Sequence, residues 1–152
     1  GTGQLYNAEL TVKHYFDSYS FLVWQREWMR KEQEGTHYED TIASAQDQER
    51  THEGLYTQLV YAAAQMWTLG ARYDSVYKNE ALVVEIPLPT TSYERYSAML
   101  EYHFSEFSRL RLQYNYNSAL YNETAAGYEQ ENVQSLILSL NLSIGAHAAH
   151  SF

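Results

Sequence analysis

The feature that most constrains the fold of this chain is the alternation of apolar and polar residues with a period of two. It is clearest in 132–144, where every even position from Leu136 to Ile144 is Leu or Ile and most odd positions are Ser or Asn. Successive side chains of a β-strand point to opposite faces, so this pattern predicts a strand that separates two environments. Helical periodicity is hard to find along the chain. The sequence therefore predicts an all-β protein.

Alternation of this kind predicts seven strands, most clearly in the last third of the chain. The expected strands are 6–16, 18–30, 55–63, 67–77, 93–105, 108–117 and 132–144. The links between them alternate in length. Short links lie at 17–18, 63–66 and 105–107, and long polar links lie at 31–53, 78–92 and 122–131. Tight turns at one end and long loops at the other are typical of bacterial outer-membrane barrels.

Aromatic residues support a membrane barrel. The chain contains 15 tyrosines, and aromatic residues make up 15% of it. Many gather toward the ends of the expected strands, where a transmembrane barrel carries an aromatic girdle at each interface. These residues are Tyr6, Phe16, Tyr19, Trp67, Tyr77, Tyr93, Tyr102, Phe104, Tyr114, Tyr116 and Tyr121. We therefore predict a transmembrane antiparallel up-and-down β-barrel with one face toward lipid and the other toward a polar lumen.

Composition excludes several other classes of protein. The net charge of −9 argues against a nucleic-acid partner. The absence of cysteine excludes disulfides, thiolate zinc sites and cysteine nucleophiles. No apolar run approaches the 18 residues of a transmembrane helix, and the first residues show no signal peptide. The glycines are scattered and form no phosphate-binding loop, so we expect no cofactor.

The odd number of strands has a consequence for the architecture. Bacterial single-chain barrels have even strand numbers, so seven strands are either an undercount or part of a larger barrel. The segment 81–87 is the candidate for a further strand, although it would break the alternation of short and long links. We favour the second explanation. Residues 1–152 are then a single domain, the C-terminal strands of a barrel completed by the same polypeptide or a partner chain.

The last third of the chain also resembles a known family. The run Tyr102-His-Phe-Ser-Glu-Phe-Ser-Arg-Leu-Arg-Leu-Gln-Tyr-Asn-Tyr116 is similar to the penultimate hairpin of a porin-like family of Gram-negative outer-membrane barrels. The ending, residues 140–152, is similar to the family's last strand, and Phe152 resembles the C-terminal signal of outer-membrane barrel proteins. Members are often labelled zinc-regulated or TonB-dependent outer-membrane receptors. The resemblance extends over 93–152 and implies an integral protein of the bacterial outer membrane, in contact with its lipid.

Charged residues on the polar sides of the strands are the first candidates for function. We expect Lys13, Arg26, Arg72, Arg95, Arg109 and Arg111 to line the lumen, opposed by Glu9, Asp74 and Glu101. Such a mildly cationic wall either favours anions or braces neighbouring strands through ion pairs. The expected function is a passive channel for small solutes or ions. The alternative is a barrel that conducts nothing and serves as a scaffold or as a receptor, including one for metal uptake.

Histidines provide a candidate metal site. His147 and His150 lie three residues apart near the end of the chain, and His37 and His52 lie near carboxylates in the first long link. Imidazole and carboxylate groups suit zinc or copper. In an ideal strand His147 and His150 point to opposite faces, so they can share one ion only if that end is irregular.

Two further alternatives remain at this point. Glu101, His103 and Ser105 share one strand face and have the His-x-Ser spacing of outer-membrane lipid A deacylases, so a lipid hydrolase is conceivable. Ser105, however, falls at a tight turn and is followed by Glu106, where that family has asparagine. A chance His-Phe-Ser is the simpler account, and we expect no enzymatic activity. A soluble sandwich or lipocalin-like barrel would also alternate, but its interior would be apolar rather than charged.

Overall fold

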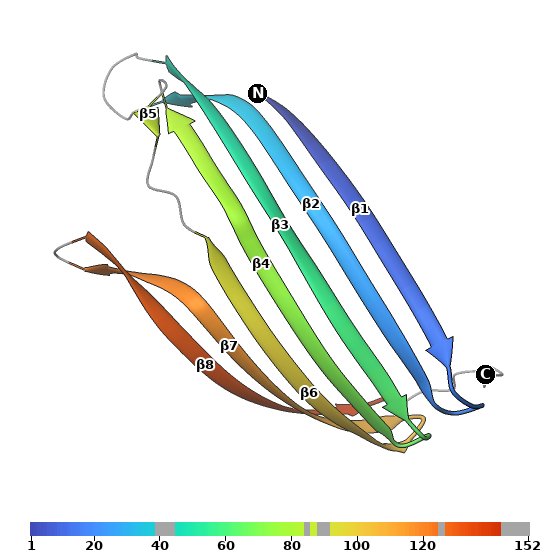
Figure 1. Cartoon of the computed structure of the whole chain (residues 1–152). Helices are drawn as coiled ribbons and strands as arrows, with labels where there is room; N and C mark the ends of the chain where they lie inside the picture. Colours follow the sequence, from blue (N-terminus) through green and yellow to red (C-terminus); the bar gives the residue numbers. More distant parts are fainter. Residues whose placement is uncertain (39–44, 84–85, 88–91, 125–126, 144–152) are drawn as a thin grey trace.

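The computed structural model describes residues 1–38, 45–83, 86–87, 92–124 and 127–143, and these form one antiparallel sheet (Figure 1). Its long strands are β1 (Thr2–Tyr15), β2 (Phe21–Tyr38), β3 (Ala45–Ala63), β4 (Trp67–Val83), β6 (Tyr93–Ser105), β7 (Ser108–Thr124) and β8 (Gly127–Leu142). Each pairs with the next long strand along the chain, so the sheet is an up-and-down meander. No helix occurs in these ranges, and hence none that could cross a membrane. The all-β, antiparallel prediction is confirmed.

All seven expected segments are strands, but most strands extend further than predicted at the end with the long links. β2 continues to Tyr38, and β3 already begins at Ala45. The extensions carry polar residues on both faces, so they show no apolar–polar alternation even though the backbone pairing continues. In the segment 81–87, β4 runs to Val83. The two-residue strand β5 (Ile86–Pro87) pairs antiparallel with the last two residues of β4, Leu82 and Val83. The expected long loops were therefore too long.

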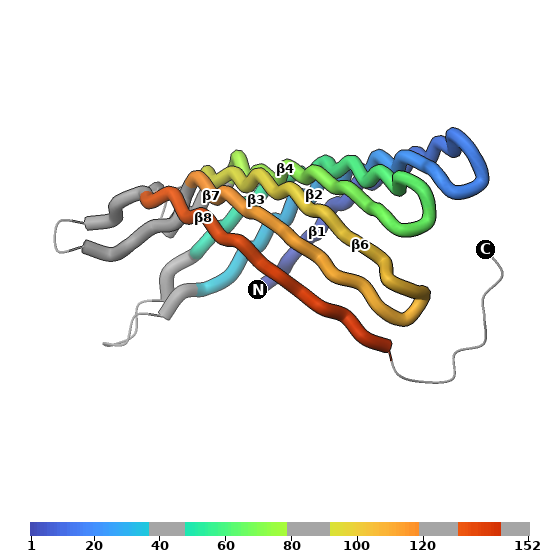
Figure 2. Tube along the Cα trace, turned by 90° about the horizontal axis from the view of Figure 1, so that it is seen from below, coloured from blue at the N-terminus to red at the C-terminus, as the bar shows by residue number. Residues whose placement is uncertain are grey.

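The described sheet is open, so it forms no closed barrel by itself, and the larger transmembrane barrel of which these strands were expected to be a part stays a prediction. β1 pairs with β2 alone and β8 with β7 alone, so both outer strands have a free edge in the described residues. The sheet is nevertheless strongly curved (Figure 2). At the end with the long connections it also divides, because the pairing of β4 with β6 ends at Val76 and Tyr93 while β4 continues to Val83.

The three short turns lie together at one end of the sheet, the lower end in Figure 1. In the β1–β2 turn, the Asp17 carboxylate accepts hydrogen bonds from the backbone N–H groups of Tyr19 and Ser20 at 2.7 and 2.8 Å. These bonds favour the charged form and lower the pKa of Asp17 below its usual value.

The turns are staggered along the strand direction. The β1–β2 turn ends where β2 begins, at Phe21. Phe21 pairs with Ala62, and the same row of directly paired residues continues across the sheet through Thr68, Glu101 and Arg111. β6 runs four residues past this row before it turns at Ser105. Each strand is thus displaced relative to a line perpendicular to the strands. A sheet that closes into a barrel of tilted strands needs such a displacement.

The register also defines two faces, because directly paired residues project to the same side of a sheet. The face that we call apolar carries Leu10, Val12, Trp24, Leu59, Leu69, Leu100, Leu112 and Leu138. The opposite face, which we call polar, carries Lys13, Gln25, Gln58, Arg72, Ser97, Glu101, Arg111 and Asn115. No second layer covers either face in the described residues. Leu136 and Leu138, for example, are both 70% exposed.

Candidate functional site

The polar face brings together six of the seven predicted pore-lining residues. Those six are Lys13, Arg72, Arg95, Glu101, Arg109 and Arg111, and the register places them all on the polar face. The prediction that they share one face is confirmed. That this face lines a pore stays a prediction.

Arg26 is the exception, and its expected position was wrong. It is paired with Leu10 on one side and with Thr57 on the other, so it lies on the apolar face. The error arose because β2 carries large apolar residues at both parities: Phe21 and Val23 on the polar face, and two tryptophans on the apolar face. Alternation alone could not choose between them, whereas pairing with β1 does.

The strongest polar cluster lies on β6 and β7 and is centred on Glu101, which is only 3% exposed. Its Oε2 accepts a hydrogen bond from Nε of Arg111 at 2.7 Å. Its Oε1 lies 2.9 Å from Nε2 of His103 and 3.5 Å from Nη1 of Arg109. We call these four residues the lower cluster, because they lie near the turn end of the sheet. One carboxylate here faces two permanent positive charges and a histidine.

The alternative catalytic trio is not assembled. Glu101 and His103 are in contact, but the register shifts between His103 and Ser105 at the end of β6. The hydroxyl of Ser105 instead lies 2.9 Å from that of Ser108 and accepts a hydrogen bond from the N–H of Phe107. Nε2 of His103 lies 3.5 Å from the Thr68 hydroxyl. A serine nucleophile needs its base within hydrogen-bond reach, and the described contacts give Ser105 a role in the turn.

A second polar cluster lies further along β4 and β6 and consists of Arg72, Asp74 and Arg95. Oδ1 of Asp74 accepts hydrogen bonds from Nε and Nη2 of Arg72 at 2.8 and 2.6 Å. The Arg72 guanidinium also stacks over the ring of Tyr56, 3.9 Å from its centroid. Arg95 is directly opposite Asp74 in the register, but its Nε donates to Oδ1 of Asn117 at 2.8 Å. We call these three residues the upper cluster.

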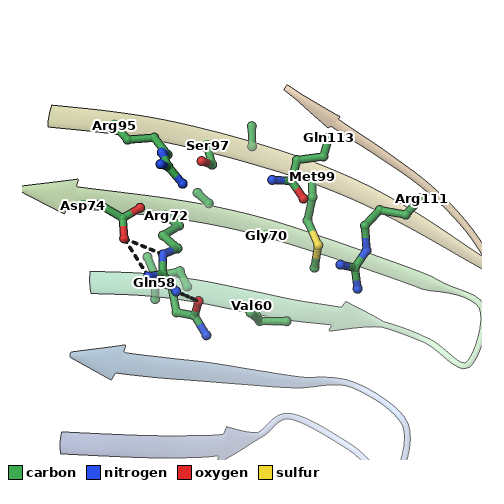
Figure 3. A pocket seen from close by; sticks show the side chains of 13 residues that line it. Gln58, Val60, Gly70, Arg72, Asp74, Arg95, Ser97, Met99, Arg111 and Gln113 are labelled. Atoms are coloured by element: carbon green, nitrogen blue, oxygen red, sulfur yellow. Dashed lines mark hydrogen bonds and ion pairs between the residues drawn. The ribbon is translucent and has the colours of Figure 1, made fainter. Parts of the chain in front are cut away.

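A shallow trough of about 460 Å³ connects the two clusters along the polar face. In Figure 3, Arg72, Asp74 and Arg95 lie at one end and Arg111 at the other. The trough exists because its middle is formed by small or flat-lying side chains. Met99 lies across Gly70, since a Cβ atom on Gly70 would come within 2.9 Å of Cγ of Met99.

The alternation in the sequence predicts the charged residues of this surface but not the trough. Gln58, Ser97 and Gln113 also line it, and Gly70 leaves room at its centre. Alternation alone shows which residues share a face within one strand. It does not show which residues of β3, β4, β6 and β7 lie side by side, because this depends on the register between strands.

The apolar face is banded. Near the turns, Trp67 lies 4.6 Å from Tyr102 and Tyr102 lies 5.0 Å from Phe104, measured between ring centroids. Further along, Tyr73 lies 5.0 Å from Tyr96. Between these two aromatic bands the face is mainly aliphatic, and its leucines are each more than a third exposed: Leu59, Leu69, Leu100, Leu112 and Leu138.

The spacing of the two aromatic bands can be compared with that in known membrane barrels. Phe104 and Tyr96 are eight residues apart on β6, which corresponds to about 27 Å along the strand at about 3.4 Å per residue. In a barrel whose strands are tilted by about 40°, this distance would be about 21 Å along the barrel axis, close to the apolar band of about 25 Å in outer-membrane barrels. Arg26 is in the same cross-sheet row as Tyr73 and Tyr96, at the margin of the aliphatic region.

The histidine prediction receives no support from the described part of the chain. His147 and His150 lie outside the described residues. Among the residues that are described, no group of three or more His, Asp or Glu side chains is close enough to hold a metal ion. His52 lies on β3, paired with Lys31 and Asn79.

Comparison with known proteins identifies a relative without an assigned activity. The chain is 36% identical over 154 residues to a protein of Aquifex aeolicus (strain VF5) that is described only as uncharacterized. The match covers 100% of this chain and 31% of the relative, so the chain spans about a third of the relative's length. No protein-family model matches the chain. No solved structure matches it either.

Proposed function

We propose that this chain is part of the wall of a bacterial outer-membrane β-barrel channel, through which small solutes or ions pass passively. The observation that carries the proposal is the asymmetry of a single-layered sheet. One face is an uncovered aliphatic surface between two aromatic bands, and the other is covered with ion-paired and amide side chains. A sheet between lipid and a water-filled lumen needs these two faces.

The soluble alternatives fit this surface less well. A sandwich or a helix-covered sheet would bury the leucines of the apolar face against a second layer. The described residues supply no such layer, and Ala62, which is 8% exposed, is the one buried hydrophobic residue among them. In the proposed arrangement lipid covers the apolar face, and the interior is polar because water fills it.

The two free edges and the staggered turns support a place within a larger barrel. β1 and β8 each expose one edge over 14 and 16 residues. An open edge of that length inside a bilayer would leave backbone groups without hydrogen bonds, which costs several kcal/mol for each group. We therefore propose that both edges pair with further strands of the same polypeptide or of a partner chain. The porin-like resemblance of residues 93–152 agrees with this arrangement.

Conductance in a planar lipid bilayer tests the proposal. The purified protein, in its complete polypeptide, should insert and give discrete ohmic current steps. A protein that inserts, as verified by protection from added protease, but gives no current would contradict the channel. The non-conducting scaffold or receptor would then be the better interpretation.

A further inference from the structure

Two arginines on the trough keep hydrogen-bond donors that the protein does not use. Arg111 contacts Glu101 through Nε, and Arg95 contacts Asn117 through Nε. Within the described residues, the terminal amino groups of these two guanidinium groups make no hydrogen bond to the protein. Both side chains line the trough (Figure 3). Guanidinium N–H groups are well suited to bind oxyanions.

The two ends of the trough differ in their balance of charge. The lower cluster contains Arg109 and Arg111 against Glu101 and so has an excess of one positive charge. In the upper cluster Arg72 and Arg95 face Asp74, and the carboxylate of Glu27 on the same face also acts on Arg72, so the charges there balance. The carboxylates serve mainly to hold arginines in place. Glu101 is buried beneath its partners and offers little surface to a cation in the lumen.

The two clusters lie at different depths along the strands. Arg72 is four residues from Thr68 on β4, and Thr68 is in the same cross-sheet row as Glu101 and Arg111. Four residues correspond to about 14 Å along the strand. A solute that moves along the lumen would meet one cluster after the other, with Gly70 and Met99 between them.

We propose that the trough is an anion track, in which a small anion such as chloride or inorganic phosphate binds at the two arginine clusters in turn. This inference rests on the proposed function, because it requires the polar face to line a lumen. Two weak sites in series satisfy the condition for selective conduction, since binding must be strong enough for entry and weak enough for exit. The barrel would accordingly select anions over cations.

Reversal potentials in a potassium chloride gradient test this selectivity. The unmodified protein should favour chloride over potassium. Arg95→Gln and Arg111→Gln should each lower the permeability ratio about fivefold, the effect of one unit charge near contact distance in water. Arg26→Gln is the matched control, because it removes the same charge from the apolar face and should leave the ratio unchanged.

Inorganic phosphate provides a second readout on the same channels. Phosphate should reduce the chloride current, and Arg111→Gln should raise the concentration needed for half block. Arg111→Lys keeps the charge but loses the planar array of donors, so it should keep the chloride preference and weaken the phosphate block.

The outcomes separate the two proposals. Absence of any current would overturn the channel and the anion track together. A current that favours cations, or one whose anion preference and phosphate block are unchanged in both glutamine variants, would overturn the anion track and leave the channel intact.

Discussion

At the scale of single residues, Glu101 is the side chain whose loss should have the largest effect. Glu101→Gln removes the charge that faces Arg109 and Arg111, so two guanidinium groups are left to repel each other around a buried amide. Losing a charged partner of this kind costs about 1–3 kcal/mol. We expect a lower midpoint of thermal unfolding in detergent micelles. We also expect a stronger preference for anions, because the lower cluster gains a positive charge.

Glu9→Gln is the control for this prediction. Glu9 lies exposed on the same face, accepts a hydrogen bond from the Thr11 hydroxyl and carries the same charge. An exposed substitution of this kind should change stability by less than about 0.5 kcal/mol. Equal losses in the two variants would mean that Glu101 does not hold the lower cluster together.

The same scale shows how far sequence could predict the site. Alternation grouped Arg109 with Arg111 and Glu101 with His103, since each pair is two residues apart on one strand. It could not show that all four meet at one carboxylate, because this contact depends on the register between β6 and β7. It misplaced Arg26 because the parity of β2 is ambiguous in isolation.

At the scale of elements, the strands were predictable where they contact two different environments. All seven were found, with β6 correct at both ends, from Tyr93 to Ser105. The ends beyond the apolar band were missed, as in the part of β2 that runs to Tyr38, because strands with polar residues on both faces resemble loops in sequence. Backbone pairing with a neighbour, which sequence alone does not reveal, extends them.

The bulge between β3 and β4 provides a test at this scale. The register shifts between Glu53 and Gly54, and a Cβ atom on Gly54 would come within 2.9 Å of the backbone oxygen of Ser75. Gly54→Ala should therefore force the two strands apart and cost about 1–3 kcal/mol, seen as a lower unfolding midpoint. Gly35→Ala is the control, since no atom lies within 4 Å of a Cβ there. Equal midpoints for the two variants would contradict the close approach at the bulge.

At the scale of the whole molecule, the two faces of the sheet must meet different surroundings. Alternation predicts these faces, and the register joins them into continuous surfaces over seven strands. Closure of the sheet into a barrel would require further strands that pair with the free edges of β1 and β8, and the described residues contain no such strands. The odd number of expected strands predicts such partners if the sheet belongs to a barrel, since an up-and-down barrel of one bacterial chain has an even number.

Two neighbouring residues on β8 allow a test of which face of the sheet is in contact with lipid. Leu138 lies on the apolar face opposite Leu112, and Ile137 lies on the polar face opposite Gln113. Both are exposed aliphatic residues, at 70% and 47%.

Arginine near the middle of a bilayer costs about 2–4 kcal/mol on the lipid side of a barrel. Leu138→Arg should therefore lower the free energy of unfolding from lipid vesicles by about that amount, whereas Ile137→Arg should be tolerated because its side chain enters water. Denaturant titration in vesicles measures both. A larger loss for Ile137→Arg would mean that the faces are inverted, and equal losses would mean that neither face is in contact with lipid.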